Sequence, residues 1–464
     1  MERNIFDFGR IPLALLGGGL IGIALMLGCG QNSNQESADS NVQIESDADR
    51  QVADFMDQLS LEEAERVLAE WVNEANQLER EFKFDESVSV WQKIVPAVES
   101  QAGSESWQAI NARLSLETAR QQANFSEQQL NLLKQTVEWR NQVLSDLQSG
   151  RMPDAVAGLQ QIDNAFAHLY GADSHGLGRV KVEIAQLYYQ QGDHSQTVHW
   201  LEQALAINRV KLGEMHPETE SNLFTLGQSQ MHLGDFEAGI ERLESALQLS
   251  RQLWGEQHLV TASRINDLGV AYQTNGQLNE ARAKFSSAID IRQQLLPEDH
   301  FALGESIRNL GVTFLDQGNA EQASKLLTRA VAIFEKSTGR ENLLTLDTRS
   351  RLATSNMLEK EYLFAENQLR QVVHEYQSQG VEGLILAKAE YQLGVALCYQ
   401  GQYQEAEPIL TRALNSRRNV LGQWHEDTVK TMKTLAVLYE RTDQMDKRDS
   451  INSALQRLQP QQDK

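Results

Sequence analysis

The sequence is poor in the residues that most often carry chemistry or interrupt helices. It has 464 residues but only 2 cysteines and 7 prolines. Cys29 follows an apolar N-terminal stretch, which leaves Cys398 alone in the rest of the chain, so we expect no internal disulfide. Cys398 lies within an apolar helical segment, and we interpret it as a buried small hydrophobe rather than a reactive thiol.

Motifs for catalysis or cofactor binding are also missing. No Cys or His pair has zinc spacing, no glycine-rich phosphate loop precedes a helix, and no Gly-x-Ser-x-Gly elbow occurs. His216, His258 and His300 recur at the repeat period described below, but equivalent residues of adjacent repeats lie too far apart to share one metal ion. We expect these histidines to act locally, near the start of the next helix. The sequence thus predicts no enzyme activity, no cofactor and no metal site.

Positive charge is scarce. Lys and Arg total 42 against 64 Asp and Glu, which gives a formal net charge of −22. Such a surface repels phosphate backbones, so nucleic acid is not an expected partner. Period-two alternation is also absent over any long stretch, although 41% of the residues are hydrophobic. The composition therefore favours an all-α protein.

What the sequence does have is a repeated helical hairpin. Leu268 and Tyr272 are four residues apart on one expected helix, and Ala281 and Phe285 are four apart on the next. This spacing places each pair on one helix face, with a tight turn at Gly276 between the helices. Such a hairpin cannot bury its apolar face alone, so it requires copies of itself on either side.

The copies keep register along the chain. The turn recurs at intervals of 42 residues, with a last interval of 41, at Gly150, Gly192, Gly234, Gly276, Gly318, Lys360 and Gly401. Five residues after each turn the residue is small, and nine residues after it the residue is large and apolar. Each unit is therefore one hairpin of a repeat array.

The pattern of Leu-Gly, Tyr, Ala, Phe and Ala at fixed offsets resembles the tetratricopeptide repeat. The long period and the Leu-Gly…His-Pro connector, seen at Leu212 to Pro217, resemble the variety found in kinesin light chains and their bacterial relatives. The resemblance implies a right-handed α-solenoid of stacked helix-turn-helix units over residues 128–458, ending in a C-terminal capping helix. We expect degenerate helical repeats over 59–127, where the register fails between 82 and 150, because one helix is unpaired or one repeat is distorted.

The N-terminus predicts export. Arg3 and Arg10 precede an uncharged run that ends at Gly28 and Cys29, which resembles a bacterial lipoprotein signal with Cys29 as the lipidated residue. The alternative is an uncleaved membrane anchor, because residues 11–29 provide 19 residues for a bilayer span; a misread start of the chain is the third possibility. Both main alternatives place the body outside the cytoplasm, anchored in the cell envelope.

Two polar segments flank the predicted repeats. Residues 29–58 are rich in Gln, Asn, Ser and acids, and we expect a disordered polar tether there. We expect residues 459–464 to form a disordered tail.

The remaining candidate for function is the inner face of the solenoid, lined by the first helix of each hairpin. The candidate partner-binding residues lie nine and ten places before the turns; they are Phe224, Asn266, Arg308, Asn309, Arg351, Tyr391 and Gln392. In kinesin-light-chain relatives, asparagines at such places hold a peptide backbone, and here only Asn266 and Asn309 match. The alternative is that these residues form ordinary solvated polar faces.

We therefore expect a non-catalytic scaffold that binds a protein or peptide segment in its concave groove. One alternative is a periplasmic module that binds a small molecule or glycan in the same groove. The other is a structural assembly subunit that stacks end to end. The sequence does not specify an oligomeric state.

Overall fold

The computed structural model describes residues 47–458, and within this range every regular element is a helix. The predicted lipidation residue Cys29, the signal or anchor segment, most of the tether and the C-terminal tail lie outside the described residues. The chain divides into two compact units, Met1–Arg264 and Ile265–Lys464, and we describe each by itself.

In unit 1, consecutive helices pack on one another from α3 to α5 and again from α6 to α11, and α2 packs on α4. Their bounds are α2 Asp47–Met56, α3 Leu61–Arg80, α4 Phe84–Ala102, α5 Trp107–Ala123, α6 Glu127–Gln148, α7 Met152–Tyr170, α8 His175–Gln191, α9 His194–Lys211, α10 Pro217–His232 and α11 Phe236–Trp254. The boundary between the units falls within α12 Leu259–Thr274.

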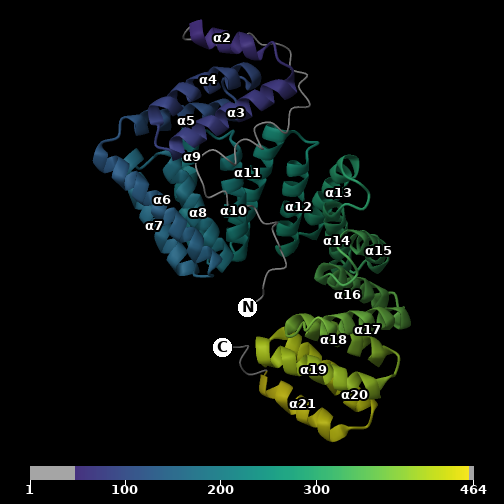
Figure 1. Cartoon of the computed structure of the whole chain (residues 1–464). Coiled ribbons are helices and arrows are strands. Elements are labelled where there is room, and N and C mark those ends of the chain that lie inside the picture. Colours follow the sequence, from purple (N-terminus) through teal and green to yellow (C-terminus); the bar gives the residue numbers. More distant parts are fainter. Residues whose placement is uncertain (1–46, 459–464) are drawn as a thin grey trace. The chain divides into compact units, whose positions relative to one another are not determined.

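Unit 2 continues the same hairpin pattern, and Figure 1 shows its helices following one another from green to yellow. Their bounds are α13 Leu278–Leu295, α14 Phe301–Asp316, α15 Ala320–Ser337, α16 Leu343–Leu358, α17 Tyr362–Ser378, α18 Leu384–Tyr399, α19 Tyr403–Leu421, α20 Glu426–Arg441 and α21 Met445–Leu458. The even-numbered helices from α6 onward are the first helices of the hairpins, and the odd-numbered ones are the second helices. The predicted all-α solenoid of stacked hairpins is confirmed.

The turns form where the sequence predicts them. Gly276 has φ of 76°, a left-handed conformation that glycine adopts without strain. At the one predicted turn that lacks glycine, Lys360 adopts the same conformation with φ of 67°, and Phe82 and Asp443 do so between α3 and α4 and between α20 and α21. The backbone geometry of the turn is therefore kept even where the preferred residue is absent.

Close approach of the two helices in a hairpin explains why small residues recur at fixed positions of the repeat. A Cβ atom placed on Gly269 would lie 2.7 Å from Cε1 of Phe285, a separation that real Cβ contacts do not show. Ala281 and Phe285 are both fully buried in the same core cluster. The glycine on the first helix therefore makes room for the large side chain on the second helix.

The connector histidines act locally, as expected. His216, His300 and His425 are the N-cap residues of α10, α14 and α20, and each side chain accepts a hydrogen bond from a backbone N–H two residues later. His258 makes the same contact through Nδ1, at 3.2 Å from the Val260 nitrogen. Asn342 takes this role at the start of α16, where its side chain accepts from the Leu344 N–H. A side-chain hydrogen-bond acceptor in the connector thus caps the N-terminus of these first helices.

The N-terminal part of unit 1 differs from the prediction in one respect. Helix α2 lies within the segment 29–58 that the sequence predicts to be a disordered tether. Met56 is fully buried and Val52 packs against the same core cluster. Because these two residues are four apart, they form one apolar face, which the polar composition of the surrounding segment conceals.

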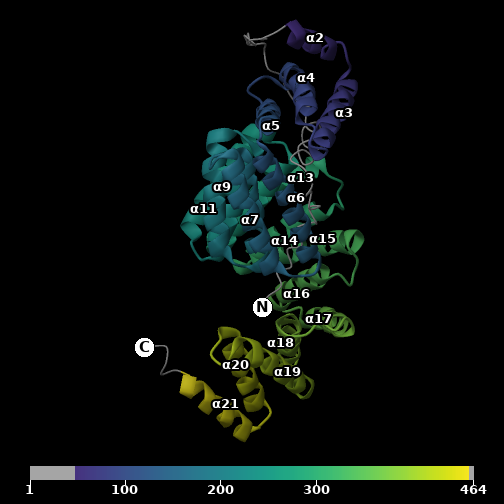
Figure 2. The same cartoon turned by 60° about the vertical axis from the view of Figure 1, so that its left-hand side comes forward.

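The register break has a structural explanation in α5. Helices α3, α4 and α5 pack together in one core cluster, with α5 lying against α4, whereas α6 pairs with α7. Helix α5 also lies against the ends of α10 and α11 (Figure 1 and Figure 2). Trp107 of α5 contacts His216 and Trp254, with ring centroids 6.1 and 6.3 Å apart. The segment 59–127 therefore holds three packed helices rather than whole hairpins, and the 42-residue register breaks there.

Candidate functional site

The first helices of unit 2 bring three cationic side chains around one carboxylate. Arg308 of α14 and Arg351 of α16 both donate to Oδ2 of Asp347, at 2.5 and 2.8 Å. Lys388 of α18 donates to Oδ1 of the same residue, at 3.4 Å. We call these four residues the Asp347 cluster. It joins three successive first helices on the face where the sequence predicts the partner to bind.

The helical spacing explains how the cluster is assembled. Asp347 and Arg351 are four residues apart on α16, so they lie on one face of that helix. Arg308 is 39 residues before Asp347, and Lys388 is 41 residues after it, close to one repeat period in each direction. Stacking of adjacent hairpins therefore brings all four side chains together.

The Asp347 cluster is partly buried and holds more positive than negative charge. Burial alone would raise the pKa of Asp347, but Arg351, Lys388 and Arg308 together hold it well below its usual range. Burial lowers the pKa of Arg308, although Asp347 opposes this effect. Burial and the neighbouring Arg351 also lower the pKa of Lys388. One carboxylate therefore balances three cations only in part.

Side-chain amides lie next to the cluster on α12 and α14. Asn309 donates from Nδ2 to Oδ1 of Asn266 at 3.4 Å, and its own Oδ1 accepts from Nη1 of Arg308 at 3.3 Å. Ser306 also donates to Oδ1 of Asn266, at 2.9 Å. The predicted asparagines are therefore brought together, and part of their hydrogen-bonding capacity is used within the protein.

The predicted residues of α18 continue this polar face. Gln392 donates from Nε2 to the Thr354 hydroxyl at 2.7 Å. The Tyr391 hydroxyl lies 3.3 Å from the Thr434 hydroxyl, and the Arg417 guanidinium lies 4.5 Å from the Tyr391 ring centroid. Both residues are half-buried, so they form part of the packing between adjacent first helices.

Three buried polar atoms on this face have no hydrogen-bond partner. They are Nε of Arg308, Oγ of Ser350 and Oε1 of Gln392, which come from α14, α16 and α18. They include an obligatory donor, a hydroxyl and an obligatory acceptor. A buried polar atom without a partner costs about 1–3 kcal/mol, and because the protein covers these atoms they do not by themselves mark a ligand site.

Phe224 lies in unit 1, where its surroundings differ from those of the other predicted residues. It is only 6% exposed, and the Arg264 guanidinium covers its ring at 3.7 Å from the centroid. Arg264 is itself held by both carboxylate oxygens of Glu220, at 2.6 and 3.2 Å. Phe224 therefore offers little free surface to a partner in this structure.

Sequence reasoning missed Asp347 and Lys388. Asp347 could have been found, because an acid four residues before Arg351 on one helix is a recognised pairing. Lys388 is harder to find, because it comes from the next hairpin and is exposed by 46% of its side chain. The sequence thus indicates the two arginines but not the counter-ion between them.

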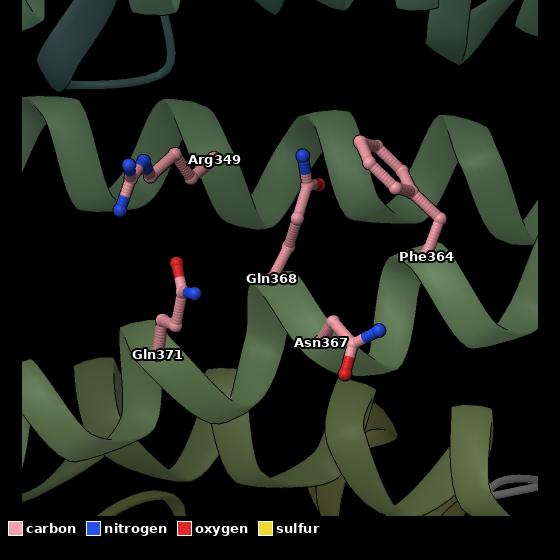
Figure 3. A pocket seen from close by; sticks show the side chains of 5 residues that line it. All are labelled: Arg349, Phe364, Asn367, Gln368 and Gln371. Atoms are coloured by element: carbon pink, nitrogen blue, oxygen red, sulfur yellow. The ribbon is translucent and has the colours of Figure 1, made fainter.

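A separate hollow lies on α16 and α17 of unit 2. Figure 3 shows its lining side chains, which are Arg349, Phe364, Asn367, Gln368 and Gln371. Phe364, Asn367 and Gln371 are all exposed, so a small molecule bound there would remain largely in contact with water. Small-molecule sites usually bury most of the ligand, so this hollow does not favour a small-molecule function.

The described residues hold neither a metal-ligand cluster nor a membrane-spanning helix. Across residues 47–458, no group of three His, Cys, Asp or Glu side chains is placed to hold a metal ion. In the same range, no helix combines the length and hydrophobicity needed to cross a membrane. Cys398 is half-buried, and burial raises its pKa to about 11, which keeps the thiol protonated.

Comparisons with known proteins agree with the fold. One family model of the tetratricopeptide repeat matches residues 218–294 and 385–447, and a second matches residues 182–218 and 303–342. No curated protein matches the sequence.

Solved structures are similar over part or most of the chain. A putative kinesin light chain of Podosopora anserina, with nearly identical tetratricopeptide-like repeats, has 25% identity and a TM-score of 0.40 over 44% of this chain and 96% of that chain. The apo form of the quorum sensor NprR from B. thuringiensis has 15% identity and a TM-score of 0.54 over 82% of this chain and 97% of that chain. The protein therefore carries tetratricopeptide repeats and has the stacked-hairpin fold of a tetratricopeptide repeat protein.

Proposed function

We propose that this protein is a non-catalytic scaffold that holds an extended protein segment on the first-helix face of unit 2. The observation that carries the proposal is the row of half-buried polar side chains, Arg308, Arg351 and Gln392, on three successive first helices. An extended polypeptide presents N–H and C=O groups along its length, so it can pair with both the guanidinium donors and the side-chain amide.

The dimensions of the face agree with a short segment. Neighbouring packed helices lie about 8–10 Å apart, so a ligand that reaches from α14 to α18 spans about 20 Å. An extended chain rises about 3.3 Å per residue, so about six residues cover this distance. Tetratricopeptide repeats are a scaffold for protein–protein interaction, which supports a protein ligand over a glycan.

A selection with random peptides tests this proposal. We expect linear peptides displayed on phage to be enriched by the full-length protein. Asn309→Ala and Gln392→Ala should each weaken binding of the selected peptide by about 1–3 kcal/mol, the range for a lost buried or charge-assisted hydrogen bond. Helical content should not change. Lys325→Ala is the control, because Lys325 is an exposed residue of the second helix α15 that pairs with Glu321.

Two results would contradict the proposal. If both variants bind the selected peptide as tightly as the wild type, the first-helix face is not the binding site. If no peptide is enriched, while a glycan array or self-association assay gives a signal, one of the alternative functions is correct.

We further propose that the protein is exported and attached to the membrane through its N-terminus. The support is the apolar run that follows Arg3 and Arg10 and ends at Cys29. If Cys29 is lipidated, the mature protein should partition into detergent, and Cys29→Ala should accumulate as the uncleaved precursor. A mature wild-type protein whose N-terminal residue is Met1 would favour the uncleaved anchor instead.

A further inference from the structure

We infer that the exposed face of α17 is an interface at which two copies of this chain pair. This inference goes beyond the proposed function, because α17 is a second helix and the proposed peptide site lies on first helices. We call this face the α17 stripe. Its exposed residues are Leu363, Phe364, Asn367, Gln371, His374, Gln377 and Ser378.

The α17 stripe lacks the charged residues that the neighbouring second helices expose. Of the exposed residues that the structure describes on α17, none is Asp, Glu, Lys or Arg. The second helices on either side do expose such residues, among them Arg329 on α15 and Arg412 on α19. On α17, Glu366 is buried and pairs with Arg370, which also pairs with Glu405 of α19. The centres of protein interfaces are depleted of charge, so this pattern indicates a surface that a partner covers.

The N-terminal end of the α17 stripe is apolar. Leu363 is 64% exposed and Phe364 is 54% exposed. At the position of Phe364, four residues after the turn, α13, α15 and α19 have the polar residues Glu280, Gln322 and Glu405. The other hairpins therefore fold with a polar residue at this place. Exposed apolar side chains that folding does not require mark an interaction surface.

A hollow beside the α17 stripe gives room for a second helix. Figure 3 shows Phe364, Asn367 and Gln371 in a row along α17, with Arg349 of α16 across the hollow. Arg349 is already paired, because its Nη2 donates to Oε1 of Glu335 at 2.5 Å. The row has the spacing of three and four residues by which one helix face packs against another helix.

The charge of the chain favours a second copy as the occupant. Two copies that each carry a net charge of −22 repel one another, so they pair best where neither contributes charge. A basic partner would instead gain from acidic residues, which the α17 stripe lacks. In an antiparallel pair with its two-fold axis near residue 369, Asn367 lies opposite Gln371 of the partner subunit, and this contact forms twice. A side-chain amide both donates and accepts, so the contact is self-complementary.

The pairing should be weak. The α17 stripe has seven exposed residues, whereas a stable interface has about 20–30 residues on each side. We therefore expect a dissociation constant of about 1–100 μM, in the range of transient complexes.

Analytical ultracentrifugation of the full-length protein in a density-matched detergent tests this inference. Between about 1 and 200 μM, the wild type should pass from monomer to dimer. Phe364→Glu should raise the dissociation constant at least about tenfold, because it adds one acid from each copy to the interface. Gln322→Glu is the matched control, because it adds the same charge at the same position of α15, and it should leave the dissociation constant unchanged. Circular dichroism should show unchanged helical content in both variants.

Cysteine cross-linking tests the antiparallel arrangement without adding charge. A mixture of Asn367→Cys and Gln371→Cys chains should be cross-linked by a short bismaleimide more readily than either variant alone. Asn415→Cys, on the exposed face of α19, should give no more cross-linked dimer than the unsubstituted chain, which supplies the background of Cys29 and Cys398.

Three results would overturn the inference. They are a wild type that stays monomeric over the whole range, equal effects of Phe364→Glu and Gln322→Glu, and growth beyond the dimer. Growth beyond the dimer would indicate end-to-end stacking, because a two-fold pair is closed. A monomeric wild type that sediments with phosphatidylcholine vesicles, and loses this binding in Phe364→Glu, would assign the α17 stripe to a lipid surface instead.

Discussion

Protonation of His216 should destabilise unit 1 between pH 7 and pH 5. His216 is 1% exposed, and it uses both ring nitrogens in the folded protein. Nδ1 accepts from the Glu218 N–H at 3.1 Å, and Nε2 lies 3.2 Å from Oδ1 of Asn111 on α5. These contacts fit the neutral tautomer with its proton on Nε2. A second proton on Nδ1 would remove the acceptor of the helix cap.

The expected magnitude follows from the pKa shift. Burial lowers the pKa of His216 from 6.5 to about 4, although Glu218 opposes this effect. Because the unfolded state binds the proton more readily, the contribution to stability is complete above pH 6.5 and is lost as the pH falls toward 4. The difference between these two pKa values lowers the free energy of unfolding by about 2 kcal/mol from pH 7 to pH 5.

The substitution His216→Asn isolates this effect. Asn342 caps α16 in the same way, with the Leu344 N–H 2.9 Å from its Oδ1, so asparagine keeps the cap and does not titrate. Urea unfolding at pH 7, 6 and 5 should be followed by tryptophan fluorescence, because six of the seven tryptophans precede Arg264. His425→Asn is the control, because this histidine is an exposed cap of α20 in unit 2.

Between pH 7 and pH 5, the free energy of unfolding should therefore fall by about 2 kcal/mol more in the wild type than in His216→Asn. The free energy of unfolding of His425→Asn should fall as much as that of the wild type. If the wild type and His216→Asn lose the same free energy, the proton on His216 is not coupled to folding, and the assigned tautomer and cap are wrong.

Two further predictions concern the hairpins themselves. Ala281 is fully buried in a core cluster of unit 2, so Ala281→Leu should overpack this cluster and reduce the free energy of unfolding by about 1–3 kcal/mol. Hydrogen exchange should quicken first in α13 and its neighbours, and equal quickening in every hairpin would contradict the repeat architecture. Lys360→Gly should raise the urea midpoint by the equivalent of about 0.5–1 kcal/mol, because it relieves a left-handed lysine, and an unchanged or lower midpoint would show that the turn is not strained.

Much of the fold can be predicted from sequence because each hairpin repeats the same spacing of apolar, small and turn residues. The small residue Ala281 and the tight turn at Gly276 are visible as spacing, and the structure confirms both. The apolar face of α2 was missed because Val52 and Met56 are isolated in a polar segment. The docking of α5 could not be foreseen, because Asn111 and His216 meet across 105 residues without any repeat pattern.

The candidate site was predicted only in part. The sequence placed Arg308 and Arg351 on one face, but it did not indicate that Asp347 contacts both of them. It also treated Phe224 as available, whereas the structure covers this ring with Arg264. Periodicity predicts which helix face a residue occupies, but the rotamers and cross-repeat partners decide whether its polar atoms are already satisfied.

The central claim, that a protein segment binds to the first-helix face of unit 2, is tested most directly by photo-crosslinking from one residue on each kind of helix. Ile385 of α18 is exposed and lies three residues before Lys388 and seven before Gln392, on the same helix face. Val420 of the second helix α19 is also exposed, at 53% against 37% for Ile385, and serves as the comparison. With p-benzoylphenylalanine at either position, the account predicts a crosslink to the selected peptide from residue 385 and none from residue 420. Crosslinks from residue 420 alone, or equal crosslinks from both residues, would contradict it.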